Sequence, residues 1–127
     1  MARTLVPIRG EQQQASQALV AGATATLITL RVPSDAVFLL EEFANDADAA
    51  SAFGKIIWRI RRNGVPQAPF ERKLDRLGGL ATPYRLARPL RFESADLVEV
   101  EVQNTDGATT FTPAAFISGT YYRYQDA

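Results

Sequence analysis

Residues 55–64 read Lys55-Ile56-Ile57-Trp58-Arg59-Ile60-Arg61-Arg62-Asn63-Gly64, and this stretch predicts a strand together with the turn that ends it. Side chains alternate between the two faces of a β-strand, so one face receives Ile56, Trp58 and Ile60 while arginines dominate the other. Asn-Gly after an extended segment is the strongest short hairpin signal, because a type I′ turn needs two positive φ angles. We therefore expect a half-buried strand with Trp58 in the core.

Comparable strand signals recur along most of the chain. Residues 97–103 alternate cleanly, with Val98, Val100 and Val102 expected inward. Prolines limit the segment 65–70 to a short or edge strand. Further strands are predicted over residues 24–32, 36–45, 84–92 and 111–124, with turns or loops over residues 33–35, 45–51, 77–80, 93–96 and 104–107. About seven or eight short strands with such spacing predict an all-β fold, either an antiparallel sandwich or a barrel.

The N-terminal residues 1–23 differ from the β domain expected over residues 24–127. Leu5-Val6-Pro7-Ile8 is a short apolar segment that suits an edge strand or a docking arm, since Pro7 argues against a central strand. Residues 10–17 are polar and are expected to form a linker or exposed loop, with a helix over residues 11–20 as the competing possibility. The first 23 residues are thus predicted to be an arm with a linker, or else the first strand.

The composition of the chain argues against several classes of function. The chain has 127 residues, which favours one domain, and it contains no cysteine and no histidine. These absences argue against disulfides, zinc, copper and haem sites, and hydrolases that use a Ser-His or Cys-His pair. The 14 basic and 14 acidic residues cancel, and no apolar run is long enough for a membrane helix. We expect a protein that is not an enzyme and has no cofactor, metal, nucleic-acid or membrane partner.

The charges are arranged in blocks. Residues 35–48 carry five acidic residues and no basic one, residues 55–91 carry ten basic and two acidic residues, and residues 93–106 carry five acidic residues. Two interpretations remain open: ion pairs between neighbouring strands of one chain, such as arginines of 55–62 with Glu99 and Glu101, or pairs between subunits.

Other candidate sites are weak. Asn45-Asp46-Ala47-Asp48 offers oxygen ligands but lacks the spacing of a calcium-binding loop. Glu99 and Glu101 are expected on the solvent face of a strand, where no cleft would make them a catalytic pair. Tyrosines 84, 121, 122 and 124 suggest a sugar-stacking platform, although packing is the simpler interpretation; Tyr122 and Tyr124 are expected on one face and Tyr121 on the other.

Three segments resemble small β-sandwich virion proteins of tailed bacteriophages. They are residues 32–43 (VPSDAVFLLEEF), residues 58–66 (WRIRRNGVP) and residues 89–104 (PLRFESADLVEVEVQN). The family pattern has glycine where this chain has Ala95. The resemblance implies a jelly-roll sandwich and a non-enzymatic role in the virion, of the capsid decoration or cement type that stabilises the head shell. A tail or baseplate component and a carbohydrate-binding β-sandwich module share the pattern and are the alternatives.

The resemblance also implies the partners. A decoration protein binds the major capsid protein or another virion protein and often forms a homotrimer, so this chain is expected in the virion after synthesis in the host cytoplasm. The predicted partner-binding residues are those of the N-terminal apolar segment and its flanking arginines: Arg3, Leu5, Val6, Ile8 and Arg9.

Overall fold

The computed structural model describes residues 3–46, 50–52, 54–67, 78–79 and 82–126. These residues form seven strands of at least seven residues and two strands of two residues. The elements are β1 (Arg3–Ser16), β2 (Thr24–Arg31), β3 (Val37–Asp46), the short 3₁₀ helix η1 (Ala50–Ala52), β4 (Ile56–Arg62), β5 (Val65–Pro66), β6 (Gly78–Gly79), β7 (Thr82–Phe92), β8 (Leu97–Asn104) and β9 (Ala114–Asp126).

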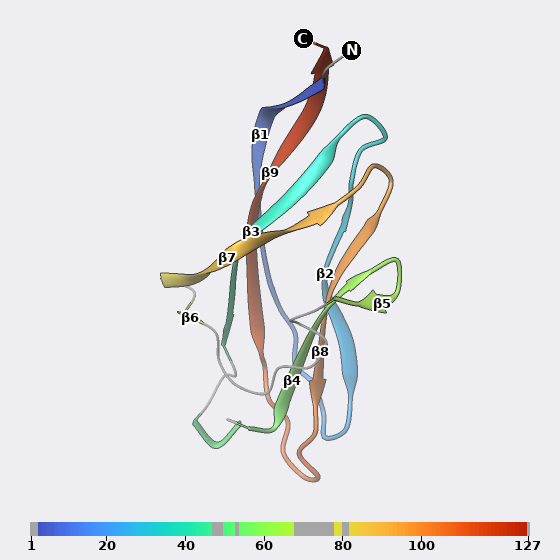
Figure 1. The fold of residues 1–127 in the computed structure, drawn as a ribbon. Helices are drawn as coiled ribbons and strands as arrows, with labels where there is room; N and C mark the ends of the chain where they lie inside the picture. The colour runs from blue at the N-terminus through green and yellow to red at the C-terminus, as the bar shows by residue number, and fades with distance from the viewer. Residues whose placement is uncertain (1–2, 47–49, 53, 68–77, 80–81, 127) are drawn as a thin grey trace.

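The strands form two antiparallel sheets that pack face to face (Figure 1). One sheet has the order β1-β9-β3-β7-β6 and the other has the order β2-β8-β4-β5. Apart from the short strand β6 at one edge, this is the strand order of a jelly roll, in which the chain crosses repeatedly between the sheets. The prediction of an all-β antiparallel sandwich is confirmed.

The core lies between the two sheets and follows the alternation in the sequence. Trp58 is buried in β4, and its indole meets the Phe43 ring of the opposite sheet edge-on, with ring centroids 6.2 Å apart. Val98, Val100 and Val102 of β8 are buried as expected. Because strand side chains alternate, every second residue of β4 and β8 supplies the same core layer.

The turn after β4 has the predicted conformation. Asn63 has a φ of 51° and Gly64 has a φ of 84°, which are the two positive angles that a type I′ turn requires. Ala95 is also left-handed, with a φ of 67°. Glycine adopts this conformation without the steric cost that alanine has.

Asp96 ties this turn to the turn before β8. Its carboxylate accepts hydrogen bonds from the Asn63 side chain at 2.9 Å and the Glu93 backbone N–H at 2.7 Å, and it forms an ion pair with Arg62 at 2.7 Å. Burial raises the pKa of Asp96, but these donors favour the carboxylate more strongly, so the net effect lowers its pKa.

The lowered pKa predicts acid sensitivity. A carboxyl group with a lowered folded-state pKa stabilises the fold fully above its ordinary pKa of about 4, and this stability is lost as the pH falls through the folded-state value. We expect Asp96→Asn to reduce the free energy of unfolding by about 2 kcal/mol at pH 7, and by much less near pH 2. Urea unfolding at both pH values measures the difference. Asp35→Asn is the control, because Asp35 lies in an exposed ion pair; equal losses at both pH values for Asp96→Asn would contradict the assignment.

Three expectations about loops are wrong. Residues 10–16 continue β1 instead of forming a linker or a helix, because pairing with β9 satisfies their backbone groups from Arg9↔Tyr121 to Ser16↔Ala114. Gly78–Gly79 forms β6 against β7 instead of a turn. Asp46 ends β3 instead of lying in the loop expected over residues 45–51. Residues 47–49, 68–77 and 80–81, which include parts of these expected loops, lie outside the described residues.

Candidate partner-binding surface

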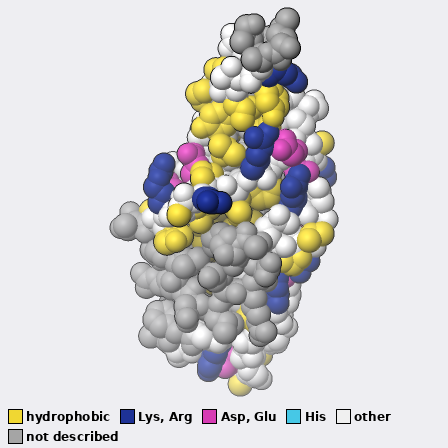
Figure 2. Space-filling view, viewed as in Figure 1, with side chains coloured by type: hydrophobic (Ala, Val, Ile, Leu, Met, Phe, Trp, Pro, Cys, Tyr) yellow, Lys and Arg dark blue, Asp and Glu magenta, His cyan; other side chains and the backbone are white. Residues whose placement is uncertain are grey.

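The candidate surface is the end of the β1–β9 ribbon, which extends past the rest of the sandwich and carries both ends of the chain (Figure 1). All five residues predicted to bind a partner lie in β1. Val6 is 37% exposed and Ile8 is 43% exposed, and Tyr124 of β9 is 38% exposed. Figure 2 shows hydrophobic side chains gathered at this end of the molecule, with basic side chains beside them. We call the exposed surface of Val6, Pro7, Ile8 and Tyr124 the tip patch.

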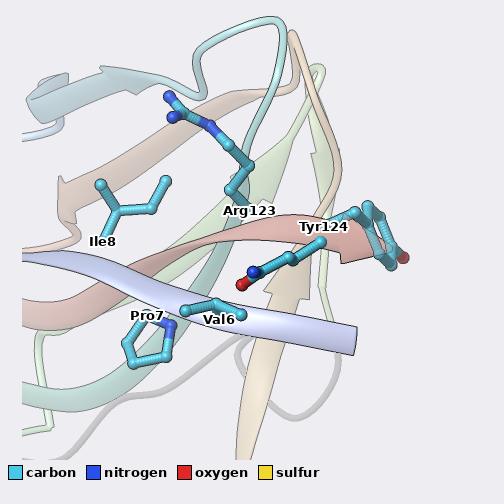
Figure 3. Close-up of a pocket in the computed structure, with 6 residues that line it drawn as sticks. Val6, Pro7, Ile8, Arg123 and Tyr124 are labelled. Carbon is cyan, nitrogen blue, oxygen red and sulfur yellow. The ribbon is translucent and has the colours of Figure 1, made fainter. Parts of the chain in front are cut away.

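A β-bulge shapes the tip patch. The register of β1 against β9 shifts between Pro7 and Arg9, so Ile8 is the extra residue. A shallow hollow lies here, and Figure 3 shows Ile8 and Arg123 projecting to the same side of the ribbon. The hollow is lined by Val6, Pro7, Ile8, Arg123, Tyr124 and Gln125.

Arginines frame the tip patch and are held in place by aromatic rings and carboxylates. The Arg3 guanidinium lies 4.6 Å from the Tyr124 ring centroid, and that of Arg9 lies 4.4 Å from the Tyr121 ring centroid. Arg91 donates a hydrogen bond to the Tyr124 hydroxyl. Arg123 forms an ion pair with Asp35 at 2.8 Å. The tip thus combines exposed aliphatic surface with positioned arginines, a composition typical of protein interfaces.

Sequence reasoning named the β1 side chains of this surface but not those of β9. Val6 and Ile8 are both exposed, whereas Leu5 is partly buried. Arg123 and Tyr124 were not among the residues predicted to bind a partner, because they come from the other end of the chain and join β1 only through strand pairing. The one sequence feature that could have pointed to Tyr124 was the alternation that places Tyr122 and Tyr124 on the same face of their strand.

The four tyrosines do not form one platform. Tyr121 is buried and packs on Phe38 with ring centroids 4.9 Å apart, and its burial raises the pKa of its hydroxyl. Tyr84 pairs with Phe43 near one end of β3, whereas Tyr122 pairs with Val37 at the other end. This separation excludes a common stacking surface for Tyr84 and the C-terminal tyrosines.

The charge blocks pair within the chain, at least in the second sheet. Glu101 accepts hydrogen bonds from Arg59 at 3.1 Å and from Arg61 at 2.9 Å, and Lys55 forms an ion pair with Asp106 at 2.8 Å. These contacts confirm the cross-strand interpretation for β4 and β8. Glu101 therefore holds two neighbouring arginines of β4.

The structure brings no metal site together within its described residues. They contain no group of three or more histidine, cysteine, aspartate or glutamate side chains that could hold an ion, while Ala47 and Asp48 of the acidic candidate lie outside them. Asn45 is buried in β3, so its side chain points away from solvent. No helix in the described part of the chain is long and apolar enough to cross a membrane.

The fold is similar to that of a solved phage protein, although the sequence is not. No protein-family model and no curated protein matches the sequence. A chain in the structure described as "Acidic stable capsid structure of Helicobacter pylori bacteriophage KHP30" superposes with a TM-score of 0.55 and 12% sequence identity. The similarity covers 99% of this chain and 100% of that chain, so the two share their fold over their whole lengths.

Proposed function

We propose that this chain is a non-enzymatic structural protein of a bacteriophage virion, and that it decorates the capsid. The observation that carries the proposal is the whole-length similarity of its fold to a chain from a phage capsid structure. The three sequence segments that resemble small β-sandwich virion proteins of tailed bacteriophages support a role in the virion. In the decorating role the protein bridges neighbouring shell subunits as a homo-oligomer and adds buried area across their joints.

The tip patch is the surface proposed to contact the major capsid protein. Burial of its aliphatic side chains lowers the free energy of the complex, and the arginines beside it are oriented before binding, which reduces the entropy lost on association. Val6 and Ile8 lie beside Arg123 and Tyr124, so apolar and charged contacts would form together.

Reconstitution on phage particles tests this proposal. The gene is deleted from the phage genome that carries it, and particles are prepared from this deletion phage. The particles are then incubated with the purified, labelled protein. We expect the protein to sediment with the heads, to saturate, and to raise the temperature at which the shells open. Val6→Asp with Ile8→Asp should weaken this binding at least about tenfold, because each change removes roughly 1.5 kcal/mol or more of apolar burial.

The control variant carries the same changes at two aliphatic residues outside the tip patch. Val20 and Val65 are 63% and 60% exposed, so Val20→Asp with Val65→Asp should leave particle binding unchanged. Recovery of the protein with purified tails instead of heads would replace decoration by a tail or baseplate role. Absence from all particle fractions, or binding to cell-surface glycans alone, would overturn the virion proposal.

A further inference from the structure

β1 presents a long sheet edge, and its half from Arg9 to Ser16 is regular. β1 is the outermost strand of its five-stranded sheet, and within the described residues only β9 pairs with it. From Arg9 to Ser16 this pairing runs without a register shift. Such an edge presents a row of N–H and C=O groups that pair readily with another extended strand.

We propose that this edge pairs with the same edge of a second copy of the chain, antiparallel and about a twofold axis at Gly10. The two five-stranded sheets then become continuous across the dimer. With this axis, residues 12–16 of each copy lie opposite residues 8–4 of the other, so the new strand pair runs past the bulge at Ile8 and includes the strand positions of the tip patch. This inference does not depend on the proposed function.

The charges of this half select the register. Arg9 and Glu11 lie on one face of the strand, with Arg9 Nη1 3.2 Å from Glu11 Oε2. An axis at Arg9 would set two arginines opposite each other, and an axis at Glu11 would set two glutamates opposite each other. An axis at Gly10 sets Arg9 of each copy opposite Glu11 of the other, and opposite charges directly across a strand pair are favourable. An axis farther along β1 leaves both charges opposite uncharged residues.

The surroundings of Gly10 permit a second strand to approach the β1 backbone closely. Gly10 brings no side chain to the axis, and a Cβ added there would lie 3.8 Å from the Gly119 carbonyl oxygen, an ordinary contact. The Arg9 side chain is 57% exposed, and its guanidinium stacks over the Tyr121 ring of the neighbouring strand β9, which fixes its position. A second copy would therefore meet a positioned cation beside an open strand.

Cysteine cross-linking tests the axis, because the chain contains no cysteine. Residues opposite each other in antiparallel strands have Cα atoms about 4.5–5.5 Å apart, within the range that a disulfide spans. Under mild oxidation, Gly10→Cys should form a disulfide-linked dimer rapidly. Gly107→Cys is the matched control, since Gly107 is also exposed and a Cβ there meets nothing within 4 Å. Equal rates for the two variants, or no dimer with either, would overturn the proposed axis.

Charge-reversal variants of Arg9 and Glu11 test the proposed strand pairing between copies without a cross-link. Arg9→Glu alone and Glu11→Arg alone each set like charges opposite each other at two positions, so each variant should dimerise about tenfold more weakly than the unchanged chain. An equimolar mixture of the two variants should recover dimerisation, because opposite charges again face each other in the mixed dimer. Sedimentation velocity measures the association, and circular dichroism verifies that each variant is folded.

The remaining outcomes contradict the proposal. An unchanged chain that stays monomeric at its highest soluble concentration would overturn it. So would a trimer, which the resemblance to decoration proteins favours, or a dimer that neither charge variant weakens.

Discussion

Gly119→Ala is expected to destabilise the protein by about 3 kcal/mol or more, because one added methyl group has no space in the sandwich. A Cβ at Gly119 would lie 2.3 Å from the Leu39 carbonyl oxygen and 2.5 Å from Cζ of Phe38. Gly119 pairs with Leu40 in the middle of the β9–β3 ladder, so the strand cannot move away without breaking its hydrogen bonds. The Phe38 ring is itself fixed between Tyr121 and Phe92.

Urea unfolding, followed by the fluorescence of the single tryptophan Trp58, measures this loss. Gly107→Ala is the control, because a Cβ at Gly107 meets nothing within 4 Å, and its free energy of unfolding should change by no more than about 0.5 kcal/mol. Stabilities typical of domains are about 5–15 kcal/mol, so recovery of Gly119→Ala largely in the unfolded state is compatible with this prediction. A variant as stable as the unchanged chain would mean that β3 and β9 lie farther apart than the structure places them.

Gly119 also illustrates what the sequence could not reveal. The strands β4 and β8 were predictable because their alternation is local, and the turn at Asn63-Gly64 was predictable because its residue types require positive φ angles. The close contact of Gly119 depends on the Phe38 ring, which belongs to a distant strand. No local pattern around Gly119 indicates that contact, since strand register is set by the whole sheet.

The same reasoning applies to β1 and the candidate surface. Residues 10–16 are glutamine-rich and have no apolar alternation, so local propensity favours a loop or a helix. Pairing with β9 overrides that propensity, and it also places Tyr124 and Arg123 beside Leu5 and Val6. The aliphatic side chains of the tip patch and the flanking Arg3 and Arg9 were therefore visible in the sequence, whereas the places of Tyr124 and Arg123 required the register.

Trp58→Ala is the second change for which we expect a large loss, about 3–5 kcal/mol, which is typical of removing a buried tryptophan. Trp58 is 1% exposed and lies between the two sheets, where its indole meets Phe43 edge-on at 6.2 Å. Alanine would leave a cavity between the two sheets, which strand pairing prevents from collapsing to fill it. Trp58→Phe should be less costly, because a ring still fills part of the space.

Far-UV circular dichroism during urea unfolding is the suitable measurement, since both Trp58 variants lack the fluorescent residue. Val65→Ala serves as the control: Val65 is 60% exposed in the short edge strand β5, and its loss should change stability by no more than about 0.5 kcal/mol. A double-mutant cycle with Phe43→Leu isolates the contact between the rings, for which a coupling of about 0.5–1.5 kcal/mol is expected. A loss below about 1 kcal/mol for Trp58→Ala would be incompatible with a tryptophan at the centre of the core. A normal loss without coupling would keep Trp58 buried but remove Phe43 as its partner, and with it the contact through which β4 and β3 join the two sheets at this point.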